Sequence, residues 1–376
     1  MNKLWRDLPA FAVDVPSSAN DPLAIAEFRS WSIREPDSKR HYTVVKLTTK
    51  NGVSGYGEGA GATHSEILEA KSVVLGRAAF EGEFIRHRLD AIPAMEAALS
   101  NAMLDLSAKS AGVPVYQYLG GPTRYEARVL AHIDARNDDE YLSSLNRARQ
   151  NGYKAFTFPI PLRDTMSRIQ EHIDLIRQRV NSLRSAAGDD IDFVLEAGGS
   201  LSPGDAAAIA TALEKVHLLW FDEPISVLTN DALSKITDES VMPVGLGRNV
   251  HDLATYQNLL RWGCIDILRP STGLNSARKI RRMAAIAETH YVAVAPHHDG
   301  GPVGTVAAIH LAASLPNFFI QQVPQPSSER DRKMRADLTS GDYETAQNGF
   351  APLINKPGLG IEVNEAALKE YSEETL

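Results

Sequence analysis

The chain has 376 residues, of which 43% are hydrophobic and 23% charged, a composition typical of a globular protein with one large or two medium domains. The formal net charge is −8 and no block of basic residues is present, which argues against a nucleic-acid partner. No stretch approaches the roughly 18 apolar residues of a membrane span, the start MNKLWRDLPAFAVDVPSS lacks the apolar run of a signal peptide, and the one cysteine, Cys264, cannot form an internal disulfide. We therefore expect a cytoplasmic protein that binds neither a membrane nor a nucleic acid.

The first third of the chain has the pattern of a small α+β domain. Residues 41–58 contain two runs rich in Val and Thr on either side of Asn51-Gly52, a pair that favours the tight turn of a β-hairpin. Residues 95–112 place apolar side chains near every third or fourth position and end at Gly112, as an amphipathic helix does. These patterns predict an N-terminal domain over residues 1–125.

From residue 127 onward, short apolar runs alternate with helical stretches. Strands that are apolar on both faces and separated by helices indicate a parallel sheet covered by helices. Eight such strands favour a closed (β/α)8 barrel over residues 126–330; the alternative, an open doubly wound sheet, would be expected to carry a GxGxxG loop after a strand, and no convincing one is present in the sequence. The candidate strands are residues 127–133, 154–160, 192–197, 218–224, 243–247, 266–270, 292–296 and 318–322.

Polar residues gather at the C-terminal ends of these strands, where the active sites of such barrels lie. Glu196 and Asp222 are separated by 26 residues, and so are Asp222 and Arg248. Since this is one strand-helix unit, we expect the three side chains to lie side by side on neighbouring strands. The strand ends carry, in chain order, His132 and Asp134, Thr157 and Pro159, Glu196, Asp222 and Glu223, Arg248 and Asn249, Arg269 and Ser271, His297 and His298, and Gln321 and Gln322.

Five segments give the chain a resemblance to a known family. They are GYGEGAGA (55–62), LDLSAKSAGVPVYQYLGG (104–121), FVLEAGGSLSPGDAAAIATALEKVHLLWFDEPI (193–225), VAVAPHHDGGPVGTVAAIHLAASLPNFFIQQ (292–322) and PGLGIEVNEAALKEY (357–371). In this order and spacing they resemble the enolase superfamily, in its mandelate racemase and sugar-acid dehydratase branch. The resemblance implies a modified (β/α)8 barrel, an N-terminal α+β capping domain whose specificity loop is GYGEGAGA, and a C-terminal segment, residues 331–376, that returns to the capping domain.

The resemblance also implies a chemistry. Members of the family abstract a proton next to a carboxylate, and a Mg²⁺ ion held by three carboxylates on strands three, four and five stabilises the enediolate. Glu196 and Asp222 match the first two ligand positions, but Arg248 stands at the third and reverses its charge. The histidine of strand seven is kept as His297. The other departures are Thr157 and Pro159 for the two lysines of strand two, Ser271 for the aspartate of strand six, and Gln322 for the glutamate of strand eight.

We hypothesise that the Arg248 guanidinium, paired with Glu196 and Asp222, fills the place of the metal, because it has no lone pair and keeps its positive charge. The catalytic residues would then be Arg248, His297 and His298. No cofactor is expected, although the family pattern implies Mg²⁺; a rearranged metal site would have to use Glu196, Asp222 and Glu223. Residues expected to contact a small-molecule carboxylate substrate are His132, Glu196, Asp222, Arg269 and, beside Glu58 in the specificity loop, Tyr56.

Two kinds of function stay open at this point. The first is a lyase of the dehydratase type, or an isomerase, that removes the α-proton of a hydroxy acid or sugar acid. The second is a protein that binds a carboxylate or sugar acid without catalysis, in which Glu196, Arg248 and Asp222 form a structural ion cluster. A monocation in place of a dication favours β-elimination over racemisation. Since barrels of this family commonly assemble, the resemblance also implies a homo-oligomer.

Overall fold

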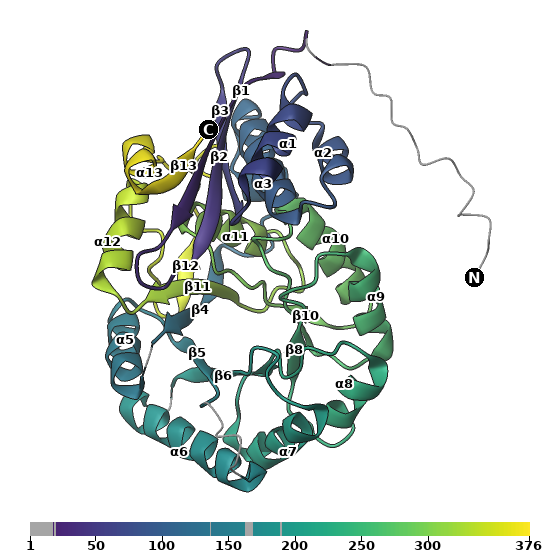
Figure 1. The fold of residues 1–376 in the computed structure, drawn as a ribbon, viewed down its shortest axis with the longest axis vertical. Coiled ribbons are helices and arrows are strands. Elements are labelled where there is room, and N and C mark those ends of the chain that lie inside the picture. The colour runs from purple at the N-terminus through teal and green to yellow at the C-terminus, as the bar shows by residue number, and fades with distance from the viewer. Residues whose placement is uncertain (1–17, 19, 136, 162–167, 189) are drawn as a thin grey trace, which may run out of the picture.

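The computed structural model describes residues 18, 20–135, 137–161, 168–188 and 190–376. The start of the chain, on which the expectation about a signal peptide rests, lies outside the described residues. In the described part of the chain, no helix is both long and apolar enough to cross a membrane. Figure 1 shows a sheet with helices at one end of the molecule and a ring of strands and helices at the other.

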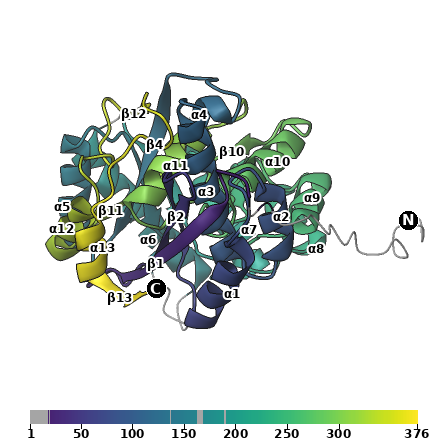
Figure 2. The same ribbon diagram turned by 90° about the horizontal axis from the view of Figure 1, so that it is seen from above.

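The N-terminal part is a four-stranded antiparallel sheet packed against helices. Gly52 has a φ of +85° in the turn between the second and third strands, a conformation that favours glycine, and the predicted hairpin is confirmed. Figure 2 shows the longest helix of this part, α3, beside β2. The strand order is β13-β1-β2-β3, and the elements are β1 (Ile25–Arg34), β2 (His41–Thr49), β3 (Ser54–Ala60), β13 (Ser372–Thr375), α1 (His64–Val74), α2 (Gly82–Arg88) and α3 (Pro93–Ser110).

Strand β3 coincides with most of the segment GYGEGAGA, which was expected to be a loop. A Cβ atom at Gly55, Gly57 or Gly59 would lie only 2.0–2.6 Å from carbonyl oxygens of α3. The three glycines therefore let the helix backbone pack directly on the strand. Because side chains alternate along a strand, Tyr56 and Glu58 lie on the opposite face, away from α3.

Eight parallel strands form the second part, in the order β10-β9-β8-β7-β6-β5-β4-β11, and a bridge between Val294 and Phe318 closes the ring. The predicted (β/α)8 barrel is confirmed. The last strand differs from the expected residues 318–322, because its pairing with β4 begins at Gln321 and continues to Pro326. The strands are β4 (Glu126–Asp134), β5 (Ala155–Pro159), β6 (Asp192–Glu196), β7 (Phe221–Asp222), β8 (Val244–Leu246), β9 (Ile267–Leu268), β10 (Ala293–Val294) and β11 (Gln321–Pro326).

Helices surround the ring of strands, as Figure 1 shows. They bury apolar side chains against the strands in one continuous core. The helices are α5 (Asp138–Gln150), α6 (Ile169–Ala187), α7 (Pro203–Leu213) with a 3-10 turn (Glu214–Val216), α8 (Asn230–Thr237), α9 (Leu253–Trp262), α10 (Ala277–Glu288) and α11 (Pro302–Ala312).

The end of the chain connects the barrel to the first sheet. β12 (Phe350–Pro352) pairs antiparallel with β4, and β13 pairs antiparallel with β1, where Trp31 lies opposite Thr375. The expectation that the C-terminal segment completes the capping domain is therefore confirmed. The remaining elements are α4 (Val115–Tyr118), which leads from the cap to the barrel, α12 (Glu329–Leu338) and α13 (Glu365–Tyr371).

Candidate active site

The interior of the barrel is built in layers, because every second residue of a strand points inward. A buried apolar cluster takes one residue on or next to seven of the strands: Leu130, Ala155, Val194, Trp220, Ile267, Ala295 and Ile320. Two residues further along each run, on the same face, stands a polar layer: His132, Thr157, Glu196, Asp222, Arg269, His297 and Gln322. This register turns His132 inward, a direction that the sequence pattern left open.

Strand β8 contributes to the polar layer in a different way. A Cβ atom at Gly245 would lie 2.5 Å from the Trp220 ring, so the ring takes the space of an inward side chain. The chain turns at Gly247, where φ is +124°, and the next side chain, Arg248, extends to the neighbouring carboxylates. Its Nη1 lies 2.6 Å from Glu196 Oε1, and its Nη2 lies 2.9 Å from Asp222 Oδ2. The predicted placement of Arg248 between the two carboxylates is confirmed.

Asp222 is fully buried and binds a second arginine, Arg269, whose Nε donates to Oδ1 at 2.8 Å. Burial alone would raise the pKa of Asp222, but Arg269 and Arg248 hold it below its usual value. Arg269 is itself fully buried, and its other amino groups donate to Gln322 Oε1 and to the Ala295 carbonyl, each at 2.6 Å. The expectation that Arg269 contacts the substrate is therefore not supported, because its donors are used inside the barrel.

Glu223 supports the loop that carries Arg248. Its own backbone has a φ of +45°, and its Oε1 accepts the backbone N–H groups of Gly247 and Arg248, each at 2.7 Å. Burial, followed by the neighbouring Asp222 carboxylate, raises the pKa of Glu223 to about 7. This glutamate therefore holds the backbone of the loop in place.

The donor set does not fit the Mg²⁺ ion that the family pattern implies. Mg²⁺ prefers oxygen ligands in a near-octahedral array, whereas the space between Glu196 and Asp222 holds a guanidinium with a fixed positive charge. Glu223, the third ligand of the alternative metal site, is bonded to the backbone instead. Within the described ranges, no group of three or more His, Cys, Asp or Glu side chains is placed to hold a metal ion.

Two histidines flank the arginine. The Nδ1 atom of His132 lies 2.9 Å from the Thr157 hydroxyl and 3.5 Å from Glu196 Oε2. His297 is buried, and its Nδ1 has no hydrogen-bond partner among the described residues. Burial, and then the charges of Arg248 and Arg269, hold the pKa of His297 well below its usual value. His297 is thus a neutral imidazole with a free nitrogen.

His298 differs from its neighbour because both of its ring nitrogens have partners. Nε2 lies 3.1 Å from the Gly301 carbonyl oxygen, and Nδ1 lies 2.8 Å from the Thr272 hydroxyl. A carbonyl oxygen only accepts, so Nε2 carries the hydrogen and Nδ1 accepts from Thr272. Burial lowers the pKa of His298 to about 4. These contacts suit a residue that fixes the loop before α11.

A cavity of about 320 Å³ lies between the mouth of the barrel and the cap. This volume is at the lower end of the range for small-molecule sites. From the cap it is lined by Arg40, His41, Glu58 and Asn101, and from the barrel chiefly by His132, Arg248, Asn249, Ser271, Thr272, Asn275, His297, His298 and Asp299.

The two residues expected in the specificity loop have different surroundings. The Tyr56 hydroxyl donates to Glu365 at 2.8 Å, and Tyr56 is absent from the described lining of the cavity. The expectation that Tyr56 contacts the substrate is therefore not supported. Glu58 does line the cavity, where its carboxylate accepts the backbone N–H groups of Gly301 at 2.6 Å and Gly304 at 3.0 Å at the start of α11.

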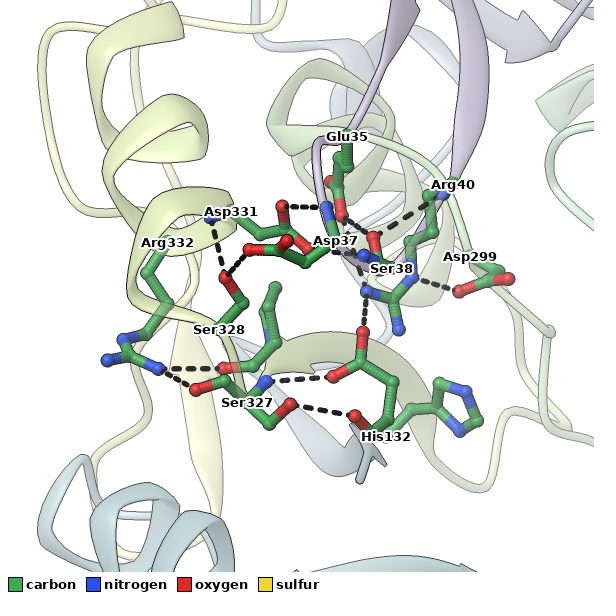
Figure 3. A network of polar contacts seen from close by, with 12 residues as sticks. Glu35, Asp37, Ser38, Arg40, His132, Asp299, Ser327, Ser328, Asp331 and Arg332 are labelled. Atoms are coloured by element: carbon green, nitrogen blue, oxygen red, sulfur yellow. Dashed lines mark hydrogen bonds and ion pairs between the residues drawn. The ribbon is translucent and has the colours of Figure 1, made fainter. Parts of the chain in front are cut away.

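Sequence reasoning missed Arg40, the residue that precedes β2. Its guanidinium lies in a network of carboxylates that Figure 3 shows, with Nε bonded to Asp299 and Nη1 bonded to Asp134 at 2.7 Å and to Glu35 at 3.4 Å. A basic residue beside a hairpin turn is ordinary on a protein surface, so the sequence carried no signal for it. Its burial comes from the docking of the cap on the barrel.

The comparisons with known proteins agree with this architecture. The family described as Enolase C-terminal domain-like matches residues 140–367, and the chain belongs to it, within the enolase superfamily. Among solved structures, a mandelate racemase/muconate lactonizing enzyme-like protein from Rubrobacter xylanophilus superposes with a TM-score of 0.83 at 23% identity, over 94% of this chain and 98% of that chain.

Two relatives carry the names of enzymes. The D-gluconate/D-galactonate dehydratase of Picrophilus torridus is 30% identical over 87% of this chain and 87% of its own length. The D-xylonate dehydratase of Haloferax volcanii is 26% identical over 98% of this chain and 94% of its own length. The chain is therefore similar, over most of its length, to sugar-acid dehydratases.

Proposed function

We propose that this protein is a dehydratase that removes water from a sugar acid, with Arg248 in the position where the family pattern implies Mg²⁺. The observation that carries the proposal is the contact of Arg248 with Glu196 and Asp222, at 2.6 and 2.9 Å, in a cavity that it shares with the neutral His297. The names of the two relatives support both the reaction and the class of substrate.

The first step is removal of the α-proton. A guanidinium has five N–H donors, so the two ion pairs of Arg248 leave others for the substrate carboxylate. A bound anion raises the pKa of a nearby imidazole, because an opposite charge favours the protonated form. His297, a neutral imidazole that lines the cavity, then takes the α-proton, while Arg248 stabilises the charge that develops on the carboxylate oxygens.

The second step is loss of the β-hydroxyl. The electron pair of the broken C–H bond forms a double bond between the α- and β-carbons, and the β-hydroxyl leaves as water after accepting a proton from His132. Glu196, 3.5 Å from His132 Nδ1, is placed to pair with the imidazolium that donates this proton. The resulting enol tautomerises to a 2-keto-3-deoxy acid. Because Arg248 carries one positive charge instead of two, expulsion of the leaving group is favoured over racemisation, which would need a long-lived dianion.

The experiment follows product formation and proton exchange together. Purified protein is incubated in D₂O with excess EDTA and D-gluconate, D-galactonate or D-xylonate, and ¹H NMR records exchange at the α-carbon and the 2-keto-3-deoxy product. We expect turnover of at least one acid in EDTA. His297→Asn should lower the rate by about 100-fold or more, the usual range for a general base, whereas His290→Gln, at an exposed position, should not.

Two results would contradict the proposal. Activity that is lost in EDTA and returns with Mg²⁺ would mean that a metal site forms despite Arg248. Tight binding of an acid without exchange or product would support the second candidate, a carboxylate-binding protein in which Glu196, Arg248 and Asp222 form a structural ion cluster.

A further inference from the structure

Arg40 brings a buried cation from the cap to the cavity, where it pairs with Asp299. It lines the cavity together with His132 and Asp299, although only 7% of the residue is exposed. Figure 3 shows its guanidinium between Glu35 and Asp299, with the His132 ring drawn below it. The cation is thus available to a molecule that is also in reach of the barrel residues.

One amino group of this guanidinium is free. Nε donates to Asp299, and Nη1 donates to Asp134 and Glu35. Nη2 makes no hydrogen bond to a described residue and is not enclosed by protein atoms. A donor held rigidly by three neighbours and open to a cavity is suited to bind an oxygen atom of a ligand.

The charge around Arg40 determines whether the ligand oxygen at Nη2 belongs to a hydroxyl or to a carboxylate. Glu35, Asp134 and Asp299 pair with Arg40, and Glu35 also pairs with the buried Arg335, which binds Glu344 as well. Four carboxylates thus face two guanidinium groups, so the local balance is already negative. Burial lowers the pKa of Arg40, but these carboxylates raise it more, so the group stays charged. A further carboxylate at Nη2 would be placed beside like charges, which is unfavourable, whereas a hydroxyl oxygen carries no charge.

Arg248, the other arginine of the cavity, has a different balance of charge around it. Arg248 and Arg269 face Glu196 and Asp222, two cations for two carboxylates, and Glu223 has a pKa of about 7. A substrate carboxylate is therefore better placed at Arg248 than at Arg40. We infer that Arg40 donates through Nη2 to a hydroxyl of the distal part of the substrate and selects sugar acids with one carboxylate over those with two. The inference rests on the proposed function and adds the class of sugar acid to it.

The test compares a matched pair of ligands, D-galactonate with one carboxylate and galactarate with two, by calorimetric titration of the full chain. We expect galactarate to bind at least about tenfold more weakly, the effect of replacing one charge-assisted hydrogen bond by repulsion. Arg40→Met should weaken D-galactonate binding about tenfold, and Arg34→Met, an exposed arginine that pairs with Glu373 on the same hairpin, should leave it unchanged.

The Asp299→Asn variant gives an independent measurement if Arg40→Met fails to fold. Asp299→Asn removes one negative charge beside Arg40 and keeps the Arg40 guanidinium. This variant should bind galactarate more tightly than the wild type does, so the ratio of the affinities for D-galactonate and galactarate should fall. Equal affinity of the wild-type protein for both acids, or a preference that Asp299→Asn leaves unchanged, would overturn the inference while dehydration of a sugar acid still stood. Binding of neither acid, with no turnover of any sugar acid, would overturn the proposed function, and this inference with it.

Discussion

The Arg248 side chain determines what the mouth of the barrel can hold. It pairs with Glu196 and Asp222, and Asp222 is also bound by Arg269 and by the Trp220 indole N–H at 2.7 Å. Asp222 therefore keeps a cationic partner when Arg248 is removed, whereas Glu196 keeps, among the described residues, only His132 as an ion-pair partner. The cluster can bind an anion, or it can serve only to stabilise the fold. Substitution of Arg248 distinguishes these two roles.

Replacement of Arg248 by glutamate should convert the cluster into a cation site. Arg248→Glu places a third carboxylate beside Glu196 and Asp222, which repel one another until a divalent cation with a preference for oxygen ligands binds. We expect the free energy of unfolding to fall by about 3 kcal/mol without metal, as when a buried ion pair loses one partner, and to recover in part with Mg²⁺. Thermal melting without metal, and at MgCl₂ concentrations raised in tenfold steps, measures both the loss of stability and its recovery.

Arg248→Met is the matched control for this experiment. It loses the same ion pairs but adds no oxygen ligand, so its melting temperature should not respond to Mg²⁺. If Arg248→Glu were equally insensitive to Mg²⁺, the carboxylates would not be placed to share an ion, and Arg248 would be a structural tie. The outcome would then favour the second candidate function.

At the scale of an element, side chains of the cap accept backbone N–H groups at the starts of barrel helices, and a side chain outside the cap accepts N–H groups of a turn in the cap. Glu58 of β3 accepts N–H groups at the start of α11, and the Asn101 side chain accepts the Ala277 N–H at the start of α10, at 3.0 Å. In the other direction, Asp331 of α12 accepts the N–H groups of Asp37 and Ser38 in the turn before Arg40, at 2.9 and 2.7 Å. Figure 3 shows this turn and Asp331 in one network with Arg40.

Loss of the Asp331 carboxylate should loosen this turn. Asp331→Ala leaves two partly buried backbone N–H groups without an acceptor, at a cost of about 1–3 kcal/mol in the free energy of unfolding. Hydrogen exchange by mass spectrometry should show faster exchange in the peptide that contains Asp37 and Ser38. Lys333→Ala, at an exposed position of the same helix, should leave this exchange unchanged and alter the free energy of unfolding by less than about 1 kcal/mol. Slow exchange retained in Asp331→Ala would show that other contacts hold the turn.

These elements also show where sequence reasoning was sufficient and where it failed. The grouping of Glu196, Asp222 and Arg248 could be predicted, because the period of two fixes which residues share a face and the 26-residue spacing puts the three at the ends of successive strands. The role of Arg269 could not be predicted in this way. The strand register places Arg269 in the polar layer, but only its hydrogen bonds to Asp222 and Gln322 show that its donors are used inside the barrel.

The cap was harder to interpret, because the face of its hairpin that meets the barrel depends on helix packing. The alternating Gly55, Gly57 and Gly59 did carry a signal, since three close contacts with α3 place Glu58 on the other face. For Arg40, the local sequence had no comparable pattern. Its burial depends on Asp134 and Asp299, which are far away along the chain.

At the scale of the whole molecule, buried titratable groups make the stability depend on pH. Burial lowers the pKa of His297 well below its usual value, and lowers those of His298 and His310 to about 4. The unfolded chain binds protons at these histidines below a pH of about 6.5, and the folded chain does not until the pH falls further. Their contribution to stability is therefore present above about pH 6.5 and is lost as the pH falls toward 4.

Two buried carboxyl groups act in the opposite direction. Burial raises the pKa values of Glu58 and Glu223 to about 7, so their contribution to stability is present below the usual pKa of a glutamate and is lost as the pH rises through about 7. The two sets of groups oppose each other in the weakly acidic range. Substitution of a single histidine outside the cavity therefore isolates one contribution to the pH dependence of stability, which the wild-type protein alone cannot do.

His310 is suited to this measurement because it joins three separate parts of the chain. It lies on α11, stacks on Tyr116 of α4 at 5.7 Å between ring centroids, and its Nε2 lies 3.1 Å from the Leu359 carbonyl oxygen of the C-terminal segment. With a pKa of about 4 in the folded chain, it should account for about 2 kcal/mol of the stability lost between pH 7 and pH 4.5. Urea unfolding of His310→Gln should show a correspondingly smaller difference between these two pH values, and the exposed control His290→Gln should match the wild type. If His310→Gln kept the full difference, the histidine would be protonated in the folded chain at pH 4.5, and the acid sensitivity would have to come from the histidines of the cavity.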